Sequence, residues 1–72
     1  MDDLEKKILV FIQNRYKKGE STSSRNIHIR FGNEIDEIEI ILEKLFEKNQ
    51  ISKYYDNQYQ EERYLPISVV KE

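Results

Sequence analysis

The 72-residue sequence contains no cysteine, no tryptophan and no alanine, and it has only one proline and two glycines. Without cysteine the chain can form neither a disulfide nor a thiolate metal site, which suits a reducing compartment. No apolar run approaches the roughly 20 residues that span a bilayer, and the N-terminal MDDLEKK is unlike a secretion signal. These absences predict a cytoplasmic, intracellular protein without a membrane partner, located in a host cell if its gene is viral or plasmid-borne.

A basic excess is also absent, because 12 lysines and arginines face 14 acidic residues, for a net charge of −2. Binding to nucleic acid would therefore depend on a local basic surface and not on the overall field of the protein. The sequence has no glycine-rich phosphate loop, and its single histidine, His28, has neither a nucleophile nor further metal ligands at a telling spacing. We expect no enzyme activity, no cofactor and no metal site, and His28 is predicted to be a partly buried packing residue.

A first helix is predicted over about residues 3–18, because apolar residues recur there at spacings of three and four. The residues predicted on its buried face are Leu4, Ile8, Phe11, Ile12 and Tyr16. Acidic residues at the start of this helix and lysines at its end match the helix dipole, and Gly19 offers a stop.

The polar stretch ESTSS predicts a short strand over about residues 20–22, followed by a helix cap at Ser23 or Ser24. The capped helix is predicted over about residues 24–31, where a short apolar face recurs at a spacing of four. The residues of that face are Ile27 and Phe31.

A third helix is predicted over about residues 34–48, with Asn33 as its N-cap and Asp36 close to a capping-box position. Its predicted buried stripe consists of Ile35, Ile38, Leu42, Leu45 and Phe46, with Ile41 at the margin. Asn49 follows the helix, and we expect it to adopt the left-handed backbone conformation that asparagine tolerates well.

Beyond the third helix the sequence changes from a helical pattern to one rich in β-forming residues. ISKYYD and ERYLPI are separated by the polar loop NQYQE, and together they predict a hairpin over about residues 50–67. Pro66 cannot donate a ladder hydrogen bond, so it belongs at a sheet edge or a strand end. Tyr64 and Leu65 are predicted to belong to the core.

This order of elements resembles the winged helix-turn-helix family over nearly the whole chain. SSRNIHIRFG is similar to the second helix of that family, and IEIILEKLFEKNQI is similar to the end of its recognition helix. The resemblance implies an α+β fold with three helices and a C-terminal β-hairpin wing, in a single domain over residues 1–72. It also implies a small DNA-binding regulator, and the amino-acid usage fits the AT-rich genomes of some archaea, their viruses and low-GC bacteria.

The chain departs from the family pattern at two neighbouring positions of the second helix. His28 replaces a residue that is usually small, and Ile29 replaces a residue that is usually polar. The histidine ring implies a wider helix spacing or a rotated second helix. Together with Val10, Ile29 predicts a homodimer patch; the alternative is that both are lone exposed apolar residues, which are common on protein surfaces.

The resemblance places the N-terminus of the second helix near the DNA backbone. There Ser23, Ser24 and Arg25 are predicted to hold a phosphate through hydroxyls, exposed amides and a guanidinium. The other predicted phosphate contacts are Lys17, Lys18, Arg30, Lys53 and Arg63. The alternative is that the serines only cap the helix and that Arg25 is an ordinary surface residue.

The third helix would face the major groove, and the wing tip would reach the minor groove. The predicted base contacts from the third helix are Asn33, Asp36, Glu37 and Ile40, and those from the wing are Asn57 and Gln58. A carboxylate can accept a hydrogen bond from the cytosine amino group, and an aliphatic side chain can contact a thymine methyl. The alternative is a solvated acidic helix face with no role in recognition.

Two functions follow from these patterns. The first is a DNA-binding protein that acts as a transcriptional regulator, whose dimerisation would double its small cationic surface. The second is a winged-helix module that binds another protein and not DNA. In that case Ile40, surrounded by acidic residues, would receive a basic, amphipathic partner segment.

Overall fold

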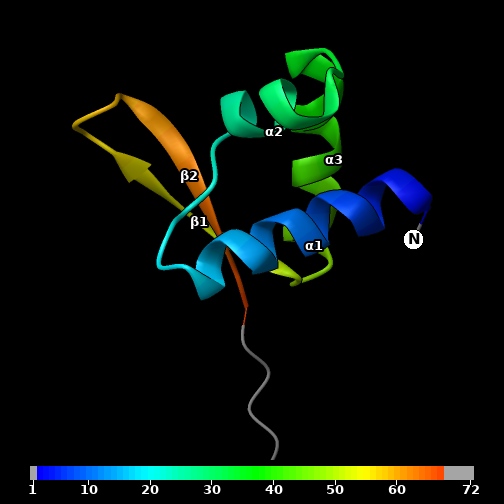
Figure 1. The fold of residues 1–72 in the computed structure, drawn as a ribbon, viewed down its shortest axis with the longest axis horizontal. Helices are drawn as coiled ribbons and strands as arrows, with labels where there is room; N and C mark the ends of the chain where they lie inside the picture. Colours follow the sequence, from blue (N-terminus) through cyan, green and yellow to red (C-terminus); the bar gives the residue numbers. More distant parts are fainter. Residues whose placement is uncertain (1, 68–72) are drawn as a thin grey trace, which may run out of the picture.

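The computed structural model describes residues 2–67, which form three helices followed by an antiparallel hairpin (Figure 1). The elements are α1 (Asp3–Lys17), α2 (Ser24–Phe31), α3 (Ile35–Glu47), β1 (Ile51–Asp56) and β2 (Glu61–Pro66). The three helices pack together, and the hairpin extends away from them (Figure 1). This is the expected α+β arrangement, and it is consistent with a winged-helix layout.

Reciprocal caps fix the starts of the first two helices. At α1 the Asp2 carboxylate accepts from the Glu5 amide at 2.8 Å, and the Glu5 carboxylate accepts from the Asp2 amide at 3.3 Å. At α2 the Ser23 hydroxyl accepts from the Asn26 amide at 3.2 Å, and the Asn26 side-chain oxygen accepts from the Ser23 amide at 2.9 Å. Ser23 and not Ser24 is therefore the cap.

The prediction of Asn33 as the N-cap of α3 is wrong. Glu34 is the N-cap and makes no side-chain capping bond, while the Asn33 amide group donates to the Glu37 carboxylate at 3.2 Å. The Asn33 carbonyl lies 2.6 Å from Nδ1 of His28 and so belongs to the turn between α2 and α3. The helix consequently begins one residue later than an Asn33 cap would require.

Left-handed residues end the helices at the predicted places. Gly19 and Gly32 have φ of 82°, and Asn49 has φ of 59°. The predicted strand at residues 20–22 is reduced to a single bridge, in which Thr22 exchanges two backbone hydrogen bonds with Tyr64 at 3.1 and 2.7 Å. The strand cannot extend because the chain turns into the α2 cap immediately after Thr22.

The core lies among the three helices and the base of the hairpin. Its buried apolar residues are Ile8, Leu9, Ile12, Ile27, Ile38, Ile41, Leu42, Leu45, Ile51 and Tyr64. Tyr16 and Phe46 were expected to be buried, but they are 49% and 37% exposed. Tyr16 lies in the last turn of α1 beyond the core, and Phe46 lies under the Lys53 ammonium group, 4.8 Å from its ring centroid.

His28 is exposed, which corrects the prediction of a partly buried packing residue. Its ring reaches the α2–α3 turn and does not pack beneath α3. Glu5, in contrast, is only 4% exposed and pairs with the Lys48 ammonium at 3.3 Å, which ties the start of α1 to the end of α3.

Two arginines, one on α1 and one on β2, link the hairpin to α1 through Ser21 in the loop that follows α1. Arg15 donates to the Ser21 carbonyl at 2.8 Å through Nη2, and Arg63 donates to the same carbonyl at 3.0 Å. Ile51 pairs with Pro66 at the buried base of the hairpin, which places the proline at a strand end as predicted.

Among the described helices, none combines the length and apolarity that crossing a bilayer requires.

Candidate functional site

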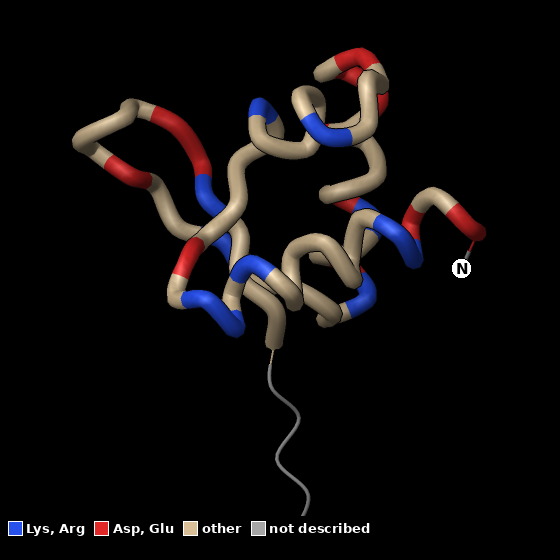
Figure 2. The backbone as a smooth tube through the Cα atoms, viewed as in Figure 1, with Lys and Arg blue, Asp and Glu red and all other residues tan. Residues whose placement is uncertain are grey.

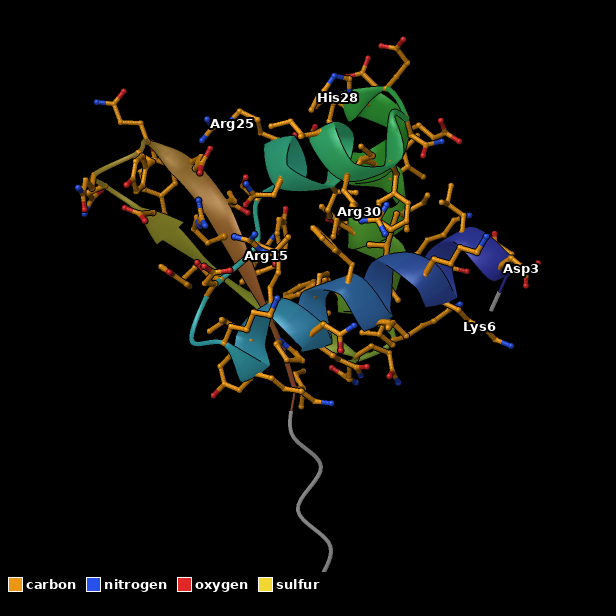
Figure 3. The ribbon with its side chains drawn as sticks, viewed as in Figure 1. Asp3, Lys6, Arg15, Arg25, His28 and Arg30 are labelled. Atoms are coloured by element: carbon orange, nitrogen blue, oxygen red, sulfur yellow. The ribbon has the colours of Figure 1, made fainter. Side chains whose placement is uncertain are left out.

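Two of the cations predicted to contact phosphates, Arg25 on α2 and Arg63 in the hairpin, form ion pairs within the chain. Arg25 donates to both carboxylate oxygens of Glu61 at 3.1 and 3.3 Å, and Arg63 donates to the same carboxylate. The Arg25 side chain is 58% exposed, whereas that of Arg63 is only 12% exposed. Figure 3 shows Arg25 at the start of α2, directed toward the hairpin. Arg25 can thus reach a ligand, but Arg63 serves mainly to hold the hairpin.

Ser23 cannot bind a phosphate through its hydroxyl, because it is fully buried and caps α2. Ser24 lies in a cleft of about 440 Å3 between α2, α3 and the hairpin. The charged residues that line this cleft are Glu39, Glu43, Glu61, Glu62 and Lys53. The lysine pairs with Glu62 at 3.5 Å, so a phosphate entering this cleft would be repelled by an excess of carboxylates.

The same glutamates act on a core tyrosine. Burial, followed by the charges of Glu62, Glu39 and Glu43, raises the pKa of Tyr64 to about 12. The phenol is therefore neutral at any physiological pH, and the negative potential of the cleft extends to the base of the hairpin.

The exposed face of α3 carries an apolar residue among acids. Ile40 is 59% exposed, and the residues three or four positions away on the same face are three acids and one lysine, Asp36, Glu37, Glu43 and Lys44. Figure 2 shows acidic segments where α3 begins, whereas basic segments occur toward both ends of α1. Within residues 2–67, Glu43 and Glu47 form no ion pair.

The remaining predicted contacts are distributed over separate parts of the surface. Lys17 and Lys18 are exposed at the end of α1, Arg30 is exposed on α2, and Asn57 and Gln58 are exposed at the hairpin tip. Asn33 is half-buried in the α2–α3 turn. Val10 and Ile29 are exposed on α1 and α2, at 49% and 74%.

The structure reveals two charged features that the sequence analysis did not single out. One is the buried Glu5 carboxylate, whose partner lies 43 positions away and leaves no local signal. The other is a basic groove between α1 and α2, to which α1 contributes Lys6 and Lys7. Lys6 and Lys7 precede Val10 by four and three positions, so each is its neighbour on the helix surface, and this spacing was the available signal. No set of His, Asp and Glu side chains within residues 2–67 is grouped to hold a metal ion.

No protein-family model, no curated protein and no solved structure matches this chain in the comparisons made.

Proposed function

We propose that the protein is a winged-helix interaction module that binds a basic, amphipathic segment of a partner protein through α3. The observation that carries this proposal is the exposed Ile40, which lies on a helix face otherwise rich in carboxylates. An apolar side chain in such a setting suits a partner helix or strand that offers one apolar anchor flanked by lysines or arginines.

The charges on the adjoining cleft support a protein partner over a duplex. Arg25 and Arg63 share the single carboxylate of Glu61, and Lys53 pairs with Glu62. The side that would meet a phosphate backbone in a winged-helix complex therefore presents more negative than positive charge. The same charges attract a basic peptide.

A fluorescent basic peptide with leucine anchors at a spacing of four would test this proposal by titration into the purified protein. Burying an isoleucine contributes about 1.5–3 kcal/mol, so Ile40→Ser should weaken binding about tenfold or more. Val10→Ser is the matched control, because Val10 is a similarly exposed aliphatic residue on α1. Equal binding by the wild type and the Ile40→Ser variant would refute the proposed contact.

Duplex DNA is the second candidate ligand, and the role of a transcriptional regulator depends on it. It is favoured by the projecting hairpin with exposed Asn57 and Gln58 at its tip, and by exposed Lys17 and Lys18. Within residues 2–67 these two lysines form no ion pair. Homodimerisation through Val10 and Ile29 would enlarge this cationic surface. Membership of the winged-helix family is part of both proposals.

A salt titration against mixed-sequence duplex DNA would test the second candidate. Each phosphate contact should contribute about −0.9 to the slope of log affinity against log salt concentration. Glu61→Gln should raise the affinity because it frees Arg25. Glu34→Gln is the control, because it removes the same charge from an exposed residue that forms no ion pair within residues 2–67. The double variant Arg25→Ala, Arg30→Ala should lower the affinity. If neither this double variant nor Glu61→Gln alters DNA affinity, the predicted phosphate contacts of α2 are wrong.

A further inference from the structure

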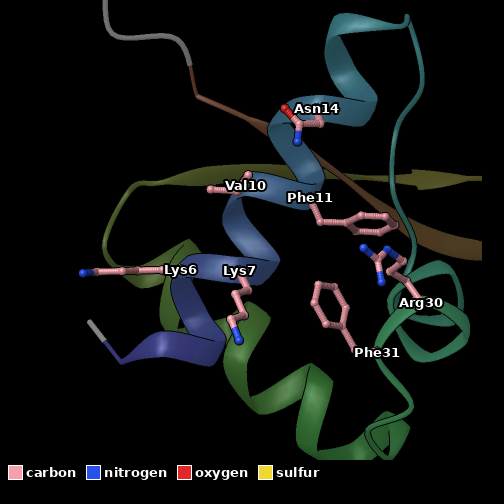
Figure 4. Close-up of a pocket in the computed structure, with 7 residues that line it drawn as sticks. All are labelled: Lys6, Lys7, Val10, Phe11, Asn14, Arg30 and Phe31. Atoms are coloured by element: carbon pink, nitrogen blue, oxygen red, sulfur yellow. The ribbon is translucent and has the colours of Figure 1, made fainter.

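A second concave surface lies between α1 and α2, on different residues from the acidic face of α3. It is an open groove of about 650 Å3 (Figure 4). The residues that line it are Lys6, Lys7, Val10, Phe11, Asn14, Arg30 and Phe31. Five come from α1 and two from the end of α2, so the groove is shared by the two helices, which meet at Phe11 and Phe31.

The floor of the groove is apolar. Phe11 and Phe31 meet edge to face with their ring centroids 5.6 Å apart, and Val10 adds a side chain that is 49% exposed (Figure 4). Arg15 covers the Phe11 ring at 5.7 Å and Arg30 covers the Phe31 ring at 5.5 Å. These guanidinium groups occupy ring faces on which a nucleic-acid base would stack, so the groove suits aliphatic or aromatic side chains that contact ring edges.

The rim of the groove is cationic and has no acidic partner among the described residues. Lys6, Lys7 and Arg30 are exposed, and none of them forms an ion pair within residues 2–67. The arginines of the hairpin side behave differently, because Arg25 and Arg63 are both held by Glu61. Three cations around an apolar floor are complementary to carboxylates placed around an apolar anchor.

We propose that this groove binds an acidic, amphipathic segment of a partner protein. The segment places an aliphatic or aromatic anchor against Val10 and the edges of the two phenylalanine rings. Its carboxylates pair with Lys6, Lys7 and Arg30. A second copy of this chain, placed symmetrically, is a poorer occupant because it would bring the three cations of each copy together. This binding does not require the proposed contact at Ile40.

The test is titration of the full chain into a fluorescent peptide that carries glutamates around leucine and phenylalanine anchors. Lys7→Glu and Val10→Ser should each weaken binding about tenfold, and raising salt from about 50 mM to about 200 mM should weaken it further. Lys44→Glu on α3 and Tyr55→Ser on β1 are the matched controls, because both residues are exposed outside the groove, and they should leave the affinity within about twofold of wild type. Both groove residues are exposed, and circular dichroism verifies that each variant keeps its helices.

Four results would overturn the proposal. The first is no binding of the acidic peptide at low salt. The second is equal binding of a peptide whose anchors are replaced by serine, since this would leave only charge attraction. The third is a single-stranded or duplex oligonucleotide whose binding depends on Lys7 and Val10 more strongly than that of the peptide. The fourth is self-association in light scattering that Lys7→Glu and Val10→Ser abolish, which would identify a second copy as the occupant.

Discussion

Tyr64 combines three roles within one residue. Its backbone bridges to Thr22, its ring closes the core at the base of the hairpin, and its hydroxyl group is in the field of three glutamates. Because burial and these charges disfavour the phenolate, the folded protein holds the phenol proton more tightly than the unfolded chain does. The stability of the fold must then depend on pH in the alkaline range.

The pKa of Tyr64 is about 12 in the folded protein, against an ordinary value of 10.0. The resulting stabilisation is fully present below pH 10 and is lost as the pH rises through 12, because the unfolded chain releases the proton first. Tyr64→Phe should remove this dependence. Denaturant unfolding of both proteins should show the wild-type advantage falling by roughly 1–3 kcal/mol between pH 10 and 12. A constant difference would contradict the assignment.

Residue-level features were predictable where the signal is local. The apolar spacing identified Ile8, Ile12 and Leu42 as core residues, and all three are buried. The burial of Glu5 was not predictable, because a glutamate in the first turn of a helix is ordinarily solvated and only the folded chain brings Lys48 to it. Exposure of His28 was missed because the α2–α3 turn, which holds its ring, has no sequence signature of its own.

Caps explain why the helix boundaries were predicted well at some ends and not at others. Ser23 lies at the N-cap of α2 and Gly32 at its C-cap, as their residue types suggest. At the start of α3 the residue type of Asn33 favours a helix cap, but Asn33 lies in the tight turn that follows Gly32. Its carbonyl there contacts the His28 ring, and its side chain donates to Glu37. The two-stranded hairpin was predictable from its β-rich segments, but the single bridge of Thr22 depends on where Tyr64 lies in space.

The cap of α2 gives a prediction at the scale of a helix. Ser23→Ala removes the acceptor of the Asn26 amide and should destabilise the protein by about 1 kcal/mol, or about 4–8 °C in Tm. Ser24→Ala is the control, because Ser24 is the first helical residue and provides no cap. Thermal unfolding by circular dichroism measures both, and equal shifts would mean that the hydroxyl of Ser23 is not the stabilising group.

The whole molecule depends on polar ties as well as on its core, since a chain of this length buries a limited apolar surface. The Ser21 carbonyl accepts from Arg15 and from Arg63, so one backbone oxygen joins α1, the following loop and β2. Arg63 also donates to the Ser21 hydroxyl at 2.9 Å. The direction of the hairpin relative to the helices is thereby set by guanidinium groups that need their forked geometry.

Arg63→Lys should therefore cost about 1–3 kcal/mol of unfolding free energy, because an ammonium group cannot reproduce the bonds to Ser21 and Glu61 together. Amide hydrogen exchange should also quicken in β1 and β2. Arg25→Lys is the matched control, since its pair with Glu61 is exposed and should contribute no more than about 1 kcal/mol. Equal losses in the two variants would argue against Arg63 as the anchor of the hairpin.

Glu61 belongs to the hairpin, yet it holds one arginine from α2 and one from its own strand. An anion that captures Arg25 removes one of the two partners of this carboxylate, and with it the ion pair between α2 and the hairpin. Thermodynamic reciprocity then requires that displacement of the wing changes the affinity of Arg25 for that anion by the same factor. Anion binding at Arg25 and the position of the hairpin are thus coupled through the Glu61 carboxylate, in a chain of only 72 residues.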